Sequence, residues 1–152
     1  MGPNSADLAR LSATVLADCA FLLTAPVEDD AEPDDPVHAV IAFRGATSGR
    51  LVLSASRDLA EIVAADMMGL SIGDPEARAH AEGAVAELAN VLLGMLVVKF
   101  CDCESSWDLG TPKVHVGTLP VLSGSSAQAA TLASDTGSIL RVQWLTDGSV
   151  MP

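Results

Sequence analysis

The chain alternates between two hydrophobic patterns, one with the period of a helix and one with the period of a strand. Apolar residues recur at helical spacing over residues 5–24, 57–68 and 76–100. The connector GATS at 45–48 suits a hairpin turn, in which we expect Gly45 to take a positive φ. Apolar runs bounded by turn residues predict strands at 37–44, 48–56, 113–122, 127–134 and 138–146. Helices between groups of strands predict an α+β fold, two layers with helices packed on a mainly antiparallel sheet.

Capping residues mark the ends of the predicted helices. Asn4 or Ser5 can cap the first helix through a side-chain oxygen. Gly69 closes the second helix because glycine tolerates the left-handed conformation that commonly ends a helix. Asp74 and Pro75 form an N-cap and a first-position proline, so they predict the start of the long helix.

The long helix at 76–100 carries polar residues in an unusual place. Glu87 and Asn90 lie three residues apart and are therefore neighbours on the helix surface. Gly83 and Gly94 continue their row, and each glycine costs a helix about 1 kcal/mol relative to alanine. We expect close approach by another part of the chain or by a partner at these glycines. The predicted apolar side of the helix consists of Ala84, Leu88, Val91, Leu92, Met95 and Val98.

The segment AELANVLLGML at residues 86–96 resembles the ExxN segment of the CheC, CheX and FliY family, bacterial chemotaxis phosphatases that act on phosphorylated CheY. The order of the surrounding elements is similar too, from the GATSGRLVLSAS strands to the proline-led TPKVHVG strand. A single ExxN resembles CheX more than CheC. One residue departs from the family pattern: Gly83 stands where members usually carry Ser or Asp.

The resemblance implies a two-layer CheC-like domain that dephosphorylates the aspartyl-phosphate of a CheY-like response regulator. Glu87 would pair with the regulator's lysine, and Asn90 would orient the attacking water, because an amide can both accept and donate a hydrogen bond. Gly83 and Gly94 would allow the helix backbone near the partner. The Mg²⁺ would belong to the regulator, the protein would need no cofactor of its own, and it would form a homodimer.

Two other functions stay open. The first is a non-catalytic CheX-like interaction module that binds a response regulator or another signalling partner without hydrolysis. The second is an unrelated domain whose long helix is used for dimerisation. A glutamate and an asparagine three residues apart are common on solvated helix faces, so turnover is the property that separates these functions from the phosphatase.

The composition of the chain limits the classes of partner that it is expected to bind. The chain of 152 residues suggests one domain, 1–152, with a frayed tail at 148–152. Twenty acidic residues against eight basic ones give a net charge of −12, which disfavours nucleic acid and anionic membranes. Residues 27–36 are acidic and contain two prolines, which predicts a solvated loop. Their spacing is not that of an EF-hand calcium loop.

No apolar run reaches the roughly 18 residues of a membrane span, and the N-terminus lacks the features of a signal peptide, so we expect a cytoplasmic protein without membrane insertion. Cys101 and Cys103 are too close for an ordinary disulfide framework. Cys19 and the Met67–Met68 pair are interpreted as core packing. We expect no metal site, and His38, His80 and His115 to be satisfied or exposed residues rather than ligands.

Overall fold

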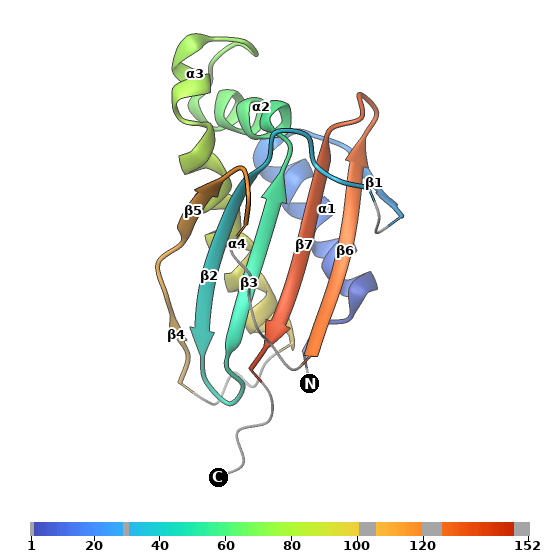
Figure 1. Cartoon of the computed structure of the whole chain (residues 1–152), viewed down its shortest axis with the longest axis vertical. Helices are drawn as coiled ribbons and strands as arrows, with labels where there is room; N and C mark the ends of the chain where they lie inside the picture. Colours follow the sequence, from blue (N-terminus) through green and yellow to red (C-terminus); the bar gives the residue numbers. More distant parts are fainter. Residues whose placement is uncertain (1, 29–30, 101–105, 120–125, 148–152) are drawn as a thin grey trace.

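A computed structural model describes residues 2–28, 31–100, 106–119 and 126–147 of the protein. Helices pack on one side of an antiparallel sheet, which confirms the predicted α+β fold (Figure 1). The helices are α1 Ser5–Ala20, α2 Arg57–Met68, α3 Pro75–Ala79 and α4 Ala81–Phe100. The strands are β1 Thr24–Val27, β2 Val37–Arg44, β3 Gly49–Ala55, β4 Asp108–Leu109, β5 Lys113–Val116, β6 Ser126–Ser134 and β7 Ile139–Thr146.

The sheet has the strand order β1-β6-β7-β3-β2-β4, and β5 also pairs with β2. Strands β3 and β7 pair along the whole length of β3, and Leu51 of β3 lies opposite Trp144 of β7. Strand β1 covers only residues 131–134 of β6, so the first half of β6 extends beyond its neighbour. One edge of the sheet is therefore formed by β1 and β6, and the other by β4 and β5 (Figure 1).

Alternate residues of the strands face the helices and form the core. On β2 these are Val37, Ala39, Ile41 and Phe43, all buried. Phe43 also stacks on Trp144, with ring centroids 4.3 Å apart. The rest of the core is aliphatic, as the low aromatic content of 3% requires. Small aliphatic side chains let the helices approach the sheet closely.

Helix α4 is the central helix of the helical layer and contacts α2, β2 and β3. Its buried residues are Ala81, Ala84, Val85, Leu88, Ala89, Leu92, Leu93, Leu96 and Val97. The predicted apolar side was wrong at Val98, which is 73% exposed, because it follows Gly94 by four residues and so continues the exposed row, outside the buried stripe. Among the described residues, α4 alone is long and apolar enough to cross a membrane by length and composition, and its packing in the core accounts for that hydropathy.

Two helix boundaries differ from the prediction. The first helix ends at Ala20 rather than at residue 24, because Phe21 adopts a left-handed conformation with φ 51°. The chain then forms β1, a strand that the apolar pattern did not predict and whose Pro26 is tolerated at a sheet edge. As a result, the predicted acidic loop at 27–36 begins with a strand residue.

The predicted long helix is divided at His80, whose backbone leaves the helical conformation at φ −104° and ψ 9°. The His80 Nδ1 lies 2.8 Å from the Glu76 carbonyl oxygen and donates to it in place of the backbone N–H. That N–H turns instead to the Ala77 carbonyl oxygen, 3.2 Å away. The predicted N-cap is confirmed, since the Asp74 carboxylate accepts a hydrogen bond from the Glu76 N–H at 2.9 Å.

The hairpin turn predicted at 45–48 is confirmed by the antiparallel pairing of β2 with β3, but Gly45 does not have the expected positive φ. A Cβ at Gly45 would instead collide with the indole ring of Trp107, so a close approach requires the glycine. The strand predicted at 113–122 ends at Val116, and Gly117 turns the chain with φ 82°. Its last residues, like Cys101, Cys103 and the tail at 148–152, fall outside the described residues.

Candidate functional site

Glu87 and Asn90 both lie on the solvent-exposed side of α4, as the sequence predicted. The residues between them fix this orientation: Leu88 and Ala89 are buried, at 2% and 0% exposure. Because the buried side of α4 is held by the sheet and by α2, the helix cannot rotate without removing these side chains from the core. The core therefore holds the carboxylate and the amide in one orientation toward solvent.

Neither side chain is used by the fold. Within the described part of the chain, Glu87 and Asn90 make no hydrogen bond and no ion pair. By contrast, Glu61 on the neighbouring α2 lies 3.7 Å from the Arg78 guanidinium. The hydrogen-bonding capacity of the Glu87–Asn90 pair thus remains available to a molecule from outside.

The two glycines of the row face open space. A Cβ built at Gly83 or at Gly94 meets no atom within 4 Å. The first explanation offered for them, close approach by another part of the chain, is therefore wrong for both positions. Within the fold, therefore, no contact requires either glycine, although each costs the helix about 1 kcal/mol relative to alanine.

A groove between α2 and α4 adjoins the Glu87–Asn90 pair. It has a volume of about 210 Å³ and is lined by Ala64, Met67, Met68, His80, Gly83, Ala84 and Glu87. Met67 packs against the core as predicted, but Met68 is 40% exposed, so the interpretation of this residue as core packing was wrong. We call this feature the α2–α4 groove. Of the row, Gly83 and Glu87 line this groove.

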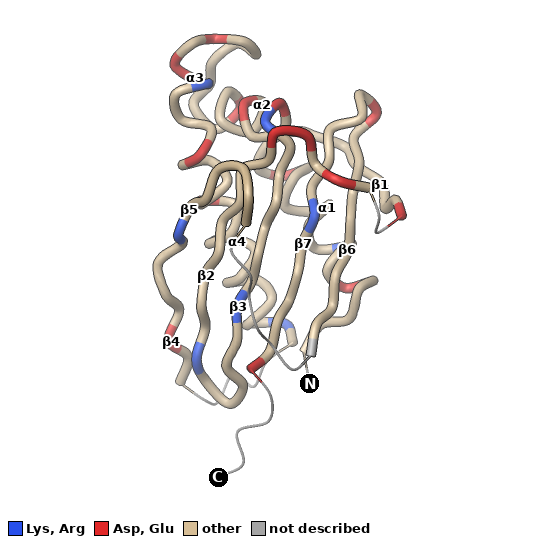
Figure 2. The backbone as a smooth tube through the Cα atoms, viewed as in Figure 1, with Lys and Arg blue, Asp and Glu red and all other residues tan. Residues whose placement is uncertain are grey.

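Acidic residues surround this end of the molecule. Figure 2 shows them on α3, around α2 and on the connection between β1 and β2, whereas several of the basic residues lie on the strands. Weak surface pairs tie the connection to α2, through Arg57 and Asp35 at 3.8 Å, and to β7, through Arg141 and Glu32 at 4.0 Å. A partner that docks at this end would meet a negative field.

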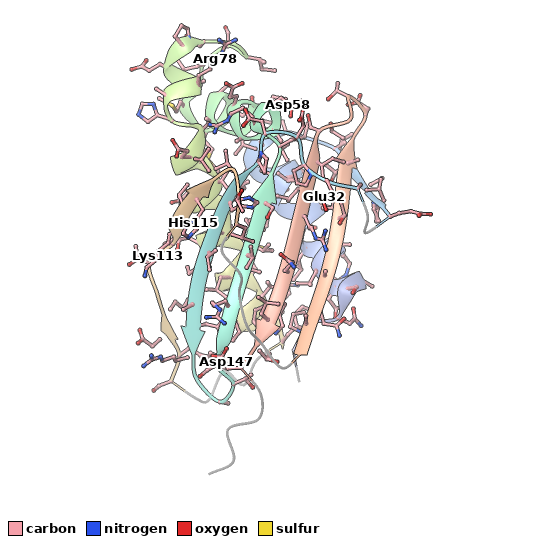
Figure 3. The ribbon with its side chains drawn as sticks, in the orientation of Figure 1. Glu32, Asp58, Arg78, Lys113, His115 and Asp147 are labelled. Atoms are coloured by element: carbon pink, nitrogen blue, oxygen red, sulfur yellow. The ribbon has the colours of Figure 1, made fainter. Side chains whose placement is uncertain are left out.

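The sequence did not single out Asp58, which links the start of α2 to the turn before β7 (Figure 3). Its carboxylate accepts hydrogen bonds from the Ser138 hydroxyl and from the Leu59 N–H, both at 2.8 Å. Burial would raise the pKa of Asp58, but the hydrogen bonds from Ser56, Ser138 and Leu59 outweigh it, so the pKa is lowered. This cluster stabilises the fold and lies outside the Glu87–Asn90 row.

His38 is held by hydrogen bonds within the fold. His38 is buried, and its Nε2 donates to the Gly117 carbonyl oxygen at 2.7 Å while its Nδ1 accepts from the Ser54 hydroxyl at 2.7 Å. Both ring nitrogens are therefore satisfied, as predicted. Among the described residues, no three His, Cys, Asp or Glu side chains are grouped as metal ligands would be.

A larger hollow of about 440 Å³ lies between α1 and β6 and does not involve α4. Most of its lining residues are small, among them Ala6, Ala9 and Ala129, and its one charged residue, Arg10, lies 3.3 Å from the Asp7 carboxylate. Its lining also includes the buried Oγ1 of Thr131, which makes no hydrogen bond. Its position beside the uncovered half of β6 makes it a feature of the sheet edge.

The fold is that of the CheC-like chemotaxis proteins. The structure is similar to a chemotaxis protein CheX from Desulfovibrio desulfuricans, with a TM-score of 0.72 and 20% identity over 91% of this chain and 95% of that one. It is similar to a CheX–CheY–BeF3–Mg²⁺ complex from Borrelia burgdorferi, with a TM-score of 0.71 and 16% identity over 93% and 96%. A CheC-like superfamily protein from Shewanella matches with a TM-score of 0.65 and 20% identity over 93% and 95%.

Residues 37–133 match the family described as chemotaxis phosphatase CheX, a region that contains both Glu87 and Asn90. The chain belongs to the CheX family, as its ExxN segment and order of elements suggested. No curated protein sequence matches the chain.

Proposed function

We propose that the protein dephosphorylates the aspartyl-phosphate of a CheY-like response regulator, with Glu87 and Asn90 at the contact. The observation that carries this proposal is the pair itself: two exposed, unpaired polar side chains on a rigid helix, flanked by glycines with open space around them. Membership of a family described as a chemotaxis phosphatase supports it. So does the related complex that contains CheY together with BeF3 and Mg²⁺, since beryllium fluoride is a stable stand-in for a phosphoryl group.

Asn90 is suited to position the water. In the reaction, water attacks phosphorus, the bond between phosphorus and the aspartyl oxygen breaks, and inorganic phosphate and a free carboxylate result. The amide oxygen of Asn90 accepts a hydrogen bond from the water, and the amide nitrogen donates to a phosphoryl oxygen. Phosphoryl transfer depends mainly on positioning and charge stabilisation, so an amide suffices without acting as a base. The water's protons pass to phosphate and solvent.

Glu87 is suited to hold the partner in register. An ionised carboxylate is an acceptor and forms a short, strong pair with an ammonium group. The regulator's lysine contacts the phosphoryl group and is the cation that Glu87 would bind. Because Glu87 lies one helical turn from Asn90, this pair would set the position of Asn90 over the phosphate. The Mg²⁺ would come with the regulator.

The protein would act as a cytoplasmic homodimer. Residues 126–130 of β6 extend beyond β1 and leave backbone groups at a sheet edge, where a second copy can pair. Dimerisation at this edge would leave the α4 row accessible, because the hollow beside β6 does not include α4.

The alternative function is a non-catalytic module that binds the regulator without hydrolysing its phosphate. The observation that favours it is Gly83, which lacks the Ser or Asp side chain usual in the family. If that side chain helps to seat the partner, its absence slows turnover and leaves binding as the main activity.

The experiment is to follow the decay of phosphorylated CheY-like regulators from the same genome with and without the protein. We expect acceleration by the native chain and its loss in Glu87→Ala. Glu82→Ala is the matched control, because Glu82 is exposed on the same helix but lies outside the row. Equal decay with and without the native protein for every regulator, while binding is measurable, would instead establish the non-catalytic module.

A further inference from the structure

We infer that the α2–α4 groove is a second docking point, which takes one apolar side chain of the response regulator next to the cation that pairs with Glu87. This inference rests on the proposed function and adds an apolar contact that increases the affinity of the protein for the regulator. The groove and the polar row share Gly83 and Glu87, so a surface that covers Glu87 also covers the groove.

The size and lining of the groove select this kind of occupant. Sites for small molecules commonly have volumes of about 300–1,000 Å³, whereas this groove has about 210 Å³. Four of its lining residues are apolar, namely Ala64, Ala84, Met67 and Met68, and Gly83, His80 and Glu87 complete the lining. Methionine adapts to irregular apolar shapes, which suits a surface that receives a side chain from another protein.

Gly83 opens the groove. A Cβ at this position meets nothing within 4 Å, so any side chain placed there extends into free space at the groove wall. The departure from the family pattern at position 83 then has a physical reason. Glycine in place of the usual polar side chain leaves the apolar groove open to a side chain of the partner. Met68 lines the same groove and is 40% exposed, so a partner's side chain in the groove would cover more of its apolar surface.

Charge favours the regulator over a second copy of the chain as the occupant. The chain has a net charge of −12, and acidic residues are concentrated around α2 and α3 at this end (Figure 2). Two copies joined through this groove would bring Glu87 and its acidic neighbours together, which is repulsive. A partner that offers a lysine beside an apolar side chain has the opposite charge at that point.

The test is the affinity of each variant for a regulator loaded with beryllium fluoride and Mg²⁺, a measurement that does not depend on turnover. In Met68→Gln, a side chain of similar length becomes polar without gaining charge, and we expect about tenfold weaker binding, equal to about 1.4 kcal/mol. Gly83→Leu should fill the groove and weaken binding by at least as much. Leucine is the better helix former, so this variant should also unfold at a higher temperature, which separates lost binding from lost folding.

Leu109→Gln is the matched control: Leu109 is 41% exposed on β4, which pairs with the end of β2 away from α2, so this change should leave the affinity unchanged. Native-like affinity in both groove variants would overturn the inference while leaving the proposed function intact. Conversion of a dimer to a monomer by Met68→Gln, measured by sedimentation, would assign the groove to self-association and overturn it as well. Failure of the native chain to bind any regulator would overturn the inference together with the proposed function.

Discussion

Replacement of Gly83 and Gly94 by alanine should stabilise the protein. Neither glycine has a positive φ, and a Cβ at either position meets no neighbour within 4 Å, so the change removes a cost without adding a clash. Glycine in a helix interior is less favourable than alanine by about 0.8–1 kcal/mol. The two sites lie eleven residues apart on α4, about 16 Å along the axis, so their effects should add to roughly 2 kcal/mol.

The assay is thermal unfolding of each single variant and of the double variant, with urea unfolding for the free energies. For a domain of this size, 1 kcal/mol shifts the melting temperature by about 2–4 °C, so the double variant should melt about 4–8 °C higher. Gly49→Ala is the control in the same protein: its Cβ would lie against the Leu145 carbonyl oxygen and 2.9 Å from the Phe43 ring, so it should be strongly destabilised. Destabilisation of Gly83→Ala or Gly94→Ala would refute the conclusion that these positions are open.

Two further predictions concern the fold. Asp58→Asn should lower the free energy of unfolding by about 1 kcal/mol near pH 7, since the exposed carboxylate accepts hydrogen bonds from Ser138 and Leu59. Its lowered pKa means that this stability is fully present above the unfolded pKa of about 3.9 and is lost as pH falls through the folded pKa, so native and variant unfolding curves should converge in acid. A constant gap down to pH 2 would contradict this. Asn4→Ala should cost about 1 kcal/mol in urea unfolding, because it removes the capping box between Asn4 and Asp7, and unchanged stability would contradict the cap.

The elements best predicted from the sequence are those whose local pattern and tertiary packing agree. Strand β2 and helix α2 have the predicted bounds because their apolar periods match the faces that the core buries. Helix α1 was predicted too long, because the apolar residues after Phe21 continue the pattern while backbone pairing of β1 with β6 is the stronger interaction. The break at His80 depends on a side-chain hydrogen bond that no periodicity reveals.

The candidate site also has parts that the sequence predicts and parts that it does not. Glu87 and Asn90 could be found from the sequence because they interrupt an apolar helix at a recognisable spacing. The α2–α4 groove could not, because only the packing of α2 on α4 brings Met67 and Met68 beside Glu87. Likewise, Gly45 and Gly83 look alike in the sequence, yet one is required by the indole of Trp107 and the other faces open space.

The most direct test of the central claim is the decay rate of a phosphorylated CheY-like regulator in the presence of Asn90→Ala. The account predicts that the native chain accelerates decay. With Asn90→Ala this acceleration should be smaller by on the order of 100-fold, the typical effect of removing one positioned polar group from an active site. Affinity for the beryllium fluoride form should remain within a few fold, because Glu87 and the α2–α4 groove are intact. Native rates of decay in Asn90→Ala would contradict the assignment of Asn90 as the residue that orients the water.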